Sequence, residues 1–341
     1  MKVLVTGATG YIGHSLAMTL AKNGNLVHIL VRNPNSTLIP QHPLIKVFTG
    51  DITKKETIIP AIENCDTVFH AAALVRSCTR RPTDFFDINV EGTRNMLDAA
   101  LRAGLKKFVF TSTAGVIGPS LNKEMSEDDP RITGFDTDYE LSKFLAEKLV
   151  KEYAHLGLHT VIAVATKVFG PGINTHPLIC INSVIRRFIS GRISFCPRPA
   201  HYVSNYVFID DLVQGHLLAA ANGRMGEKYI LGGENISYVD FFEKLRFVSG
   251  MKGIVLPIPK WIAAIRGGLH FILHKLTGKD PFYNSKAVSL IYCNKSFTSD
   301  KAKNELGYSI TPFTTALKQT IRSLIIESYA KQSIYPDYGV Q

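Results

Sequence analysis

The stretch Met1-Lys-Val-Leu-Val-Thr-Gly-Ala-Thr-Gly-Tyr-Ile-Gly13 decides the fold of this chain. It reads as a short apolar strand at residues 3–5, a turn with three glycines, and a helix whose apolar positions continue through Leu16 and Leu20. One glycine allows a sharp reversal, the next lets backbone N–H groups approach a pyrophosphate, and the third lets the helix pack on the strand. A glycine pattern alone is weak evidence, but its place between a strand and a helix predicts a dinucleotide site at the helix N-terminus.

Strand-like and helix-like segments alternate along the following part of the chain. The strand candidates lie at residues 3–5, 26–31, 45–49, 67–70, 107–111 and 160–165. Each is separated from the next by a segment long enough for a crossover, which is typical of a parallel sheet with helices on both faces. The prediction is therefore an α/β protein with a Rossmann-type doubly wound parallel sheet, whose ligands lie beyond the carboxyl ends of the strands.

Composition limits the possible classes of protein. The 341 residues, 45% hydrophobic and 20% charged, are typical of a soluble globular protein. We see no secretory leader pattern before the first strand. The five cysteines are widely spaced and odd in number, so we expect reduced thiols in a cytoplasmic protein and no metal site.

Positive charge is concentrated towards the C-terminus. Residues 252–303 contain nine Lys or Arg and two acids, within a chain of net charge +11. Such a surface would attract an anionic substrate tail, an acidic membrane surface or nucleic acid, and a solvated face without a partner is an equal alternative. Nucleic acid is the poorest of these interpretations, because the region contains no recognised binding module.

The ends of the second, third and fourth strands indicate how the adenosine half of a dinucleotide would be bound. Arg32 follows the second strand, where an acid would bind the ribose hydroxyls and an arginine suits a 2'-phosphate. This favours NADP, with NAD possible. Asp51 and the adjacent Ile52 end the third strand, where a carboxylate could bind the adenine amino group. The small side chains of residues 71–73 would let the cofactor lie against the backbone, and His70 is interpreted as a packed or capping histidine.

A tyrosine and a lysine four residues apart supply the candidate chemistry. Tyr139-Glu-Leu-Ser-Lys143 lies in a segment with helical apolar spacing, so both side chains project from one face. A lysine there favours the phenolate and is expected to lower the pKa of Tyr139 towards working pH. Thr113, at the end of the fifth strand, could hold the substrate oxygen beside it. The alternative is an ordinary amphipathic helix surface, which the upstream dinucleotide turn disfavours.

Together these segments resemble the extended short-chain dehydrogenase/reductase family, also described as NAD-dependent epimerases and dehydratases. The resemblance spans nearly the whole chain. It rests on Thr6-Gly-Ala-Thr-Gly-Tyr-Ile-Gly13, Gly50-Asp51, His70-Ala-Ala-Ala73, Asn89-Val-Glu-Gly-Thr93, Tyr139 to Lys143, Phe169-Gly-Pro171 and Val207-Phe-Ile-Asp-Asp211. Gly226-Glu-Lys-Tyr-Ile-Leu-Gly-Gly-Glu-Asn235, Thr277-Gly-Lys-Asp-Pro281 and Glu305-Leu-Gly-Tyr308 look like the dihydroflavonol-reductase-like branch, which includes proteins called hopanoid-associated sugar epimerases.

The resemblance implies roles for individual residues. Tyr139 would be the proton donor or acceptor, Lys143 its electrostatic partner and a ribose ligand, and Thr113 would stand where the family usually has a catalytic serine. The cofactor-binding residues that we expect are Gly7, Thr9, Gly10, Tyr11, Ile12, Gly13, Arg32, Asp51, Ile52, Ala71, Ala72, Ala73, Asn89, Lys143, Ala165, Thr166 and Val168.

Three departures bear on the reaction. Sugar dehydratases have an Asp-Glu pair where this chain has Ala114 and Gly115, which disfavours elimination of water. Nucleotide-sugar epimerases commonly have an arginine where this chain has Ser204, although Arg76, Arg80, Arg81 or Arg198 could replace it. Lys167 stands beside the expected nicotinamide position, where it either points into solvent or binds an anionic substrate group.

The resemblance also implies two domains. We expect residues 1–171 with 204–225 to form the dinucleotide-binding domain, 172–203 with 226–330 a smaller, discontinuous α+β substrate domain, and 331–341 a weakly ordered tail. Residues 259–276 are acid-free. They predict a lid helix whose apolar stripe, which includes Trp261 and Ile265, faces the core, or alternatively a helix on a membrane surface.

The function predicted from the sequence is an NADP(H)-dependent oxidoreductase that interconverts a carbonyl and a secondary alcohol on a small apolar or anionic-tailed substrate. A sugar epimerase and a non-catalytic NADP-binding sensor are the alternatives. The expected partners are a small-molecule substrate and at most a weak membrane surface, with a monomer or homodimer as the assembly.

Overall fold

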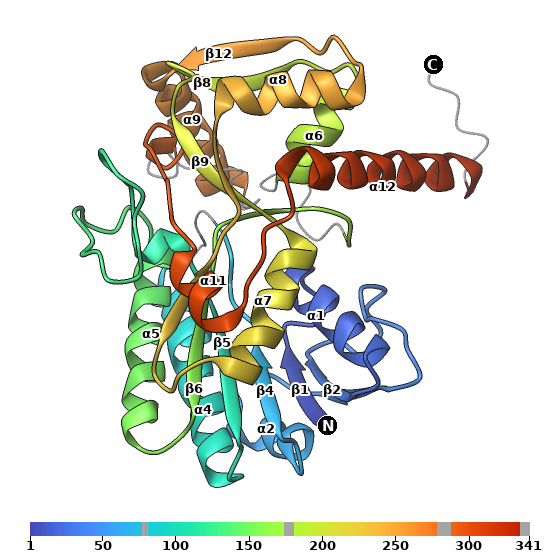
Figure 1. The fold of residues 1–341 in the computed structure, drawn as a ribbon, viewed down its shortest axis with the longest axis vertical. Coiled ribbons are helices and arrows are strands. Elements are labelled where there is room, and N and C mark those ends of the chain that lie inside the picture. The colour runs from blue at the N-terminus through green and yellow to red at the C-terminus, as the bar shows by residue number, and fades with distance from the viewer. Residues whose placement is uncertain (77–78, 80, 174–180, 278–287, 335–341) are drawn as a thin grey trace.

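Two parts of unequal size make up the molecule in the computed structural model, which describes residues 1–76, 79, 81–173, 181–277 and 288–334 (Figure 1). Side chains are described for these residues except 269–277 and 328–334. Of the sequence features named above, Arg80, residues 278–281 and residues 335–341 lie outside the described part of the chain.

The larger part is built on a seven-stranded sheet in the order β10-β6-β5-β4-β1-β2-β3, and all neighbouring strands are parallel. Six of the strands correspond to the six predicted from the sequence, with β1 one residue longer at each end and β5 two residues longer, to Thr113. The sheet strands are β1 Lys2–Thr6, β2 Leu26–Val31, β3 Ile45–Thr49, β4 Thr67–His70, β5 Lys107–Thr113, β6 Thr160–Ala165 and β10 Lys228–Leu231.

The seventh strand differs from the sequence-based division of the chain. The boundary expected at residue 226 placed residues 228–231 in the substrate domain, whereas β10 pairs with β6 in the main sheet. Tyr229, Ile230 and Leu231 are completely buried there. By pairing with β6, this strand satisfies the backbone groups of β6 that would otherwise form an exposed sheet edge.

Residues 167–169 and 203–208 also differ from the expected division, because they form a separate small sheet with residues 234–237, and residues 300–306 pack on the larger part. The rest of the domain division stays a prediction.

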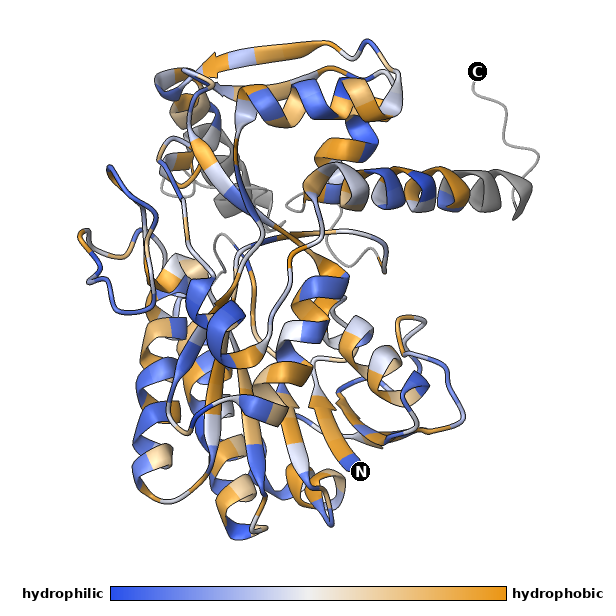
Figure 2. Cartoon of the chain, viewed as in Figure 1, coloured by the Kyte–Doolittle hydropathy of each residue, from blue (hydrophilic) through white to orange (hydrophobic). Residues whose placement is uncertain are grey.

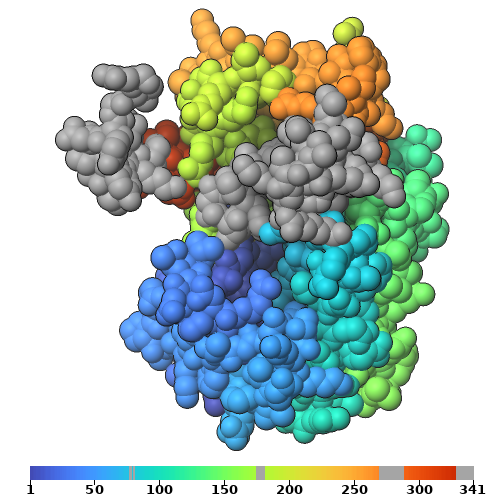
Figure 3. Space-filling model, turned by 180° about the vertical axis from the view of Figure 1, so that it is seen from behind, coloured from blue at the N-terminus to red at the C-terminus, as the bar shows by residue number. Residues whose placement is uncertain are grey.

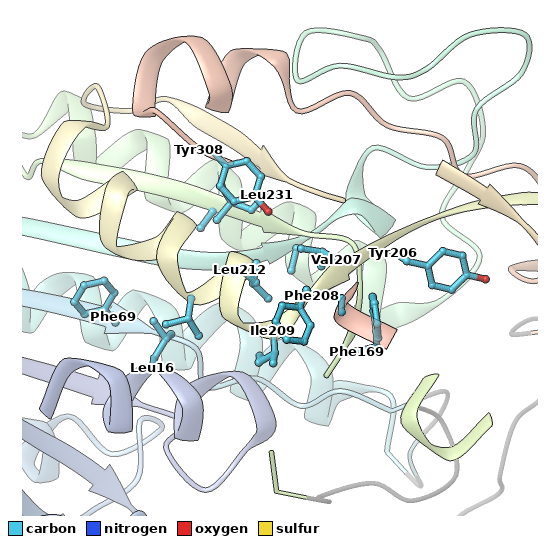
Figure 4. Packing of buried hydrophobic residues seen from close by; sticks show 14 of the residues in the cluster. Leu16, Phe69, Phe169, Tyr206, Val207, Phe208, Ile209, Leu212, Leu231 and Tyr308 are labelled. Atoms are coloured by element: carbon cyan, nitrogen blue, oxygen red, sulfur yellow. The ribbon is translucent and has the colours of Figure 1, made fainter. Parts of the chain in front are cut away.

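Helices cover both faces of this sheet, because its strands alternate apolar side chains between two cores. Val3 and Val5 pack into one core with α1 and α7, whereas Leu4 packs into the other with α2, α4 and α5. Figure 4 shows the first core, which runs from Phe69 to Tyr206 at its far end. The helices of this part are α1 Tyr11–Lys22, α2 Lys55–Ile62, α3 Thr83–Phe86, α4 Gly92–Arg102, α5 Asp138–His155, α7 Ile209–Asn222 and α11 Asp300–Leu306, with the π-helix η1 Asp87–Glu91 and the 3-10 helix η2 Ala114–Val116.

The smaller part lies at the carboxyl-end side of the sheet and forms the opposite lobe in the space-filling view (Figure 3). It contains a three-stranded sheet in the order β11-β9-β7 and a two-stranded sheet of β12 and β8. These two sheets with their helices give the smaller part an α+β architecture. Its elements are β7 Lys167–Phe169, α6 Ile181–Ile189, β8 Ser194–Arg198, β9 Val203–Phe208, β11 Glu234–Ser237, α8 Tyr238–Ser249, β12 Val255–Pro259, α9 Lys260–Thr277 and α12 Phe313–Ile334.

The orientation of α9 contradicts the core-facing lid interpretation for the part of the helix whose side chains are described. Trp261 is 64% exposed and Ile265 58%, whereas Ala263 faces inward and packs with Val288 and Tyr292. The apolar stripe that was expected to contact the core therefore faces solvent in the first two turns of the helix. None of the described helices is both long and apolar enough to cross a bilayer.

Candidate active site

The turn between β1 and α1 leaves no space for side chains at its first and third glycines. A Cβ on Gly7, where φ is +75°, would lie 2.7 Å from the backbone N of Ala72, and one on Gly13 would lie 2.2 Å from the carbonyl oxygen of Gly7. Both contacts are with backbone, which cannot move aside as a side chain could. α1 begins after Gly10 without a side-chain cap and has no acid in its first turn. Its first N–H groups thus form a cradle suited to an anion.

Tyr11 joins this turn to the smaller part of the molecule. Its hydroxyl donates to the carbonyl oxygen of Gly170 at 2.7 Å, beyond the end of β7, and its ring packs against Gly172. The side chain of Asn182 donates to the same carbonyl at 2.8 Å. The glycine turn and the start of α6 are therefore held together by one hydrogen-bonded group.

The carboxyl ends of β2 and β3 meet beside the glycine turn, as parallel neighbours must. Arg32 is exposed there. The carboxylate of Asp51 accepts from the backbone N and the hydroxyl of Thr53, both at 3.0 Å, and so shapes the turn after β3. Ile52 is buried, and its carbonyl accepts from Asn95 at 2.9 Å. Arg32 is thus the exposed cation at the expected adenosine end.

The end of β4 is fixed by His70. This residue has no exposed surface, and its ring nitrogens lie 2.7 Å from the Thr6 hydroxyl and 3.0 Å from the Thr93 hydroxyl. Burial lowers the pKa of His70 to about 3, so the ring is neutral at physiological pH. His70 is a packed histidine, as the sequence indicated, and it orients the half-buried residues 71–73 towards the turn.

Asn89 lies in the π-helix η1, and both the oxygen and the nitrogen of its side-chain amide form hydrogen bonds with other residues of the protein. Its oxygen accepts from the N of Leu74 at 2.7 Å, and its nitrogen donates to the Leu74 carbonyl and to the Ser142 hydroxyl. Ser142 in turn donates to the Tyr139 carbonyl at 2.8 Å. Asn89 therefore positions both the chain after Ala73 and the helix that carries Tyr139, and a direct contact with the cofactor stays a prediction.

The three candidate catalytic side chains come together at the ends of β5 and α5. The hydroxyl of Tyr139 lies close to that of Thr113, near enough for Thr113 to act on its pKa as a hydrogen-bonding neighbour. Lys143, one turn along α5, is 2% exposed and donates from Nζ to the carbonyl oxygen of Thr111 at 2.8 Å. Its ammonium also lies over the Phe110 ring, 3.9 Å from the centroid. The i, i+4 spacing places both side chains on the face of α5 that meets β5.

Burial controls the electrostatics of this group more than the lysine does. Desolvation raises the pKa of Tyr139 to about 12, against a lowering effect of the Thr113 hydrogen bond. Desolvation also lowers the pKa of Lys143 to about 7, against the raising effect of Glu147. The expected drop in the pKa of Tyr139 is therefore absent from the protein alone, because the low-dielectric surroundings disfavour both charged forms. Tyr139 is a neutral phenol at physiological pH.

Two carboxylates near this group were not predicted from the sequence. Glu147 is buried one turn beyond Lys143 and accepts from the Ser112 hydroxyl at 2.5 Å. Glu140 lies beside Gly115, where a Cβ would be 3.1 Å from its Oε1. Glu147 could have been found by extending the i, i+4 spacing by one more turn. Glu140 could not, because its position beside Gly115 depends on a tertiary contact.

A buried hydroxyl without a partner among the described residues lies at the expected nicotinamide end. Ala165 pairs with Thr113 across β6 and β5, which places the following residues beside the catalytic group. The Oγ1 of Thr166 is buried and has no hydrogen-bond partner among the described residues. A buried unpaired hydroxyl costs about 1–3 kcal/mol, so this atom is suited to a ligand. With the glycine cradle, it shows that the residues present fit a nicotinamide dinucleotide.

Lys167 does not extend into solvent. Its side chain is half-buried and donates from Nζ to the hydroxyls of Ser204 at 2.6 Å and Tyr238 at 3.1 Å. Of the arginines that might have replaced a phosphate-binding residue, Arg81 forms an ion pair with Asp84 at 2.6 Å and Arg198 is exposed. Lys167 is thus the cation that β7 holds beside Thr166.

The geometry defines a dinucleotide-dependent enzyme of the short-chain dehydrogenase/reductase type. Residues 3–232 match the family model described as the NAD dependent epimerase/dehydratase family, and the chain belongs to this family. It is 27% identical over 322 residues to a 3-beta-hydroxysteroid dehydrogenase of Mycolicibacterium neoaurum, covering 90% of this chain and 86% of the relative. It is 26% identical over 334 residues to a putative dihydroflavonol 4-reductase of Synechocystis, covering 96% and 95%. The structure of a UDP-glucose 4-epimerase of Thermotoga maritima shares the fold, with a TM-score of 0.78, 21% identity and coverage of 96% and 100%.

Proposed function

We propose that the protein is an NADP(H)-dependent oxidoreductase that interconverts a ketone and a secondary alcohol. The observation that carries this proposal is the juxtaposition of the Tyr139 and Thr113 hydroxyls, with the buried Lys143 one helical turn away. A phenol at that position can donate a proton to a carbonyl oxygen or recover it from an alcohol. The bound dinucleotide would supply or accept the hydride.

Each residue of the group has a distinct part in this reaction. Thr113 holds the substrate oxygen against the Tyr139 hydroxyl, so that the proton moves along an existing hydrogen bond. Because burial keeps Tyr139 protonated, the protein alone is set for reduction, with the phenol as proton donor. Lys143 stabilises the phenolate that forms when the proton leaves. The hydrogen bond from Ser112 to Glu147 joins β5 to α5 and so helps to fix the two elements that carry Thr113 and Lys143.

The preference for NADP rests on Arg32, the exposed cation at the end of β2. We expect Arg32→Ala to raise the KM for NADPH roughly tenfold, because a charge-assisted hydrogen bond contributes about 1.5–3 kcal/mol, and to leave the kinetics with NADH unchanged. Arg102→Ala is the control, since Arg102 ends α4 at the opposite, amino-end side of the sheet. Steady-state kinetics with both dinucleotides test this. An equal loss with NADPH and NADH would contradict the preference.

The substrate in this proposal carries an anionic group that is bound by two lysines. Within the described part of the chain, Lys167 has only neutral hydrogen-bond partners, Ser204 and Tyr238. Lys295 is 14% exposed, and its Nζ lies 3.9 Å from Glu140, whose carboxylate also binds Arg131 at 3.2 Å. Burial and the charges of Lys167 and Arg131 lower the pKa of Lys295.

Three cations therefore face two carboxylates, Glu140 and the nearby Asp136, in this part of the site. The excess positive charge is partly desolvated, and a carboxylate or phosphate on the substrate would compensate it. The relative named as a hydroxysteroid dehydrogenase supports a hydroxyl-bearing and largely apolar body for such a substrate.

A panel of ketones tests both parts of this proposal. NADPH oxidation is measured with apolar ketones that carry a carboxylate and with their methyl esters. For Lys167→Met we expect the KM for the acids to rise roughly tenfold with kcat nearly unchanged, because the lost interaction is uniform binding, and no change for the esters. Equal effects on acids and esters would contradict the anionic group. Failure of every ketone to oxidise NADPH would contradict the oxidoreductase itself.

A further inference from the structure

The two-stranded sheet of β8 and β12 exposes four large apolar side chains on one face. In this ladder Phe195 pairs with Leu256, and the N of Ser194 donates to the Ile254 carbonyl at 2.9 Å. Because alternate residues of a strand share a face, Ile193 and Phe195 lie beside Ile254 and Leu256. The exposed fractions are 41% for Ile193, 41% for Phe195, 56% for Ile254 and 44% for Leu256. We call this group the β8–β12 face.

Further exposed apolar side chains continue from the ends of this sheet. Phe247 is 84% exposed and Met251 42%, both just before β12. Trp261 and Ile265, in the helix that follows β12 directly, are more than half exposed. Figure 2 shows β12 as hydrophobic along most of its length at the outer edge of the molecule, and Figure 3 shows this end opposite the lobe formed by the N-terminal residues. Monomeric soluble proteins seldom expose so many neighbouring large apolar groups.

The two strands and the segments that flank them in the chain carry only positive charge, and the first acid before β12 in the sequence is Glu243 on α8. Residues 172–209 and 244–279 together contain eleven Lys or Arg and no Asp or Glu. Arg187 lies over the ring of Phe195, 5.6 Å from its centroid, and donates to the Ile193 carbonyl. Arg192 and Lys252 are exposed next to the two strands. The apolar side chains and the cations are therefore adjacent on one end of the smaller part.

We propose that the β8–β12 face docks on the surface of an anionic lipid bilayer. Apolar side chains that enter the interface lose water, and basic side chains beside them contribute about 1 kcal/mol each against anionic lipids. A second copy of the chain is a poor occupant, because both copies would bring the same mostly positive surface together. The described helices do not cross the bilayer, so the docking is peripheral.

Vesicle flotation of the full-length protein tests this proposal. We expect binding to phosphatidylcholine vesicles that contain phosphatidylglycerol, no binding to phosphatidylcholine alone, and weaker binding at high salt. Phe195→Ser combined with Leu256→Ser should weaken binding by roughly tenfold or more. Arg192→Glu combined with Lys252→Glu should have a similar effect.

The matched control is Ile59→Ser combined with Leu156→Ser, which removes two apolar side chains that are 61% and 63% exposed on the larger part. Thermal unfolding should be nearly unchanged in all three variants, because every substituted side chain is exposed. Absence of binding to the anionic vesicles would overturn the proposal, as would equal binding to neutral ones. A dimer in native mass spectrometry that the Phe195 and Leu256 substitutions dissociate would also overturn it, because the face would then join two copies.

Discussion

Tyr139→Phe is expected to lower kcat/KM for carbonyl reduction by roughly 10²- to 10⁴-fold, the usual contribution of a positioned proton donor. The substitution removes one oxygen and leaves the ring, so the packing at the end of α5 is retained. The lost group is the hydroxyl that lies beside that of Thr113. Since no expected dinucleotide contact passes through that hydroxyl, the affinity for the cofactor should remain close to that of the natural protein.

A second tyrosine on the same helix provides the control. Tyr153 donates its hydroxyl to Asp98, away from Thr113 and Lys143. Tyr153→Phe should retain activity and lose a little stability, because Asp98 loses one hydrogen bond but is partly exposed and keeps its ion pair with Lys55. Steady-state kinetics and fluorescence titration with the dinucleotide separate the two variants. Retained turnover in Tyr139→Phe would refute the proton-transfer mechanism, whatever its effect on folding.

Much of the arrangement around Tyr139 can be predicted because it follows from local spacing and from parallel strand ends. The sequence predicts six of the seven strands of the main sheet, and the carboxyl ends of parallel strands share one edge, so the glycine turn, Thr113 and Ala165 had to lie along it. The strand β10 falls in the substrate domain of the division that the resemblance implies, and only its pairing with β6 places it in the main sheet.

Contacts between distant segments could not be predicted in this way. Glu140 meets Lys295 only because the segment before α11 pairs with β9, which no local pattern encodes. The pKa of Tyr139 was misjudged for a related reason. Spacing shows that a lysine lies one turn away, but it does not show how much water is removed from both groups, and here desolvation outweighs the charge. The exposed stripe of α9 likewise depends on what packs against it.

Lys143→Met should lower kcat/KM for the dinucleotide roughly 10²- to 10³-fold, as expected when a preorganised cationic donor is removed. The kcat/KM for the dinucleotide reports ionisations of the free enzyme. With the pKa of Lys143 lowered to about 7, the natural protein should lose this efficiency as the pH rises through 7, because the ammonium that would bind the ribose is deprotonated. The variant should show no such decline. Lys148→Met, on the exposed side of the same helix, is the control and should keep the decline.

The stability of the natural protein should rise with pH in the range where its catalytic efficiency falls. Lys143 titrates near 10.5 in the unfolded chain and near 7 in the folded one, so between these values the unfolded state binds more protons. The contribution of Lys143 to the free energy of unfolding therefore rises with pH across this window and is lowest below pH 7, where a buried ammonium must be desolvated. Lys143→Met should remove this rise and raise the melting temperature most at low pH. A variant with lower activity but an unchanged pH dependence of melting would show that Lys143 is not desolvated as described.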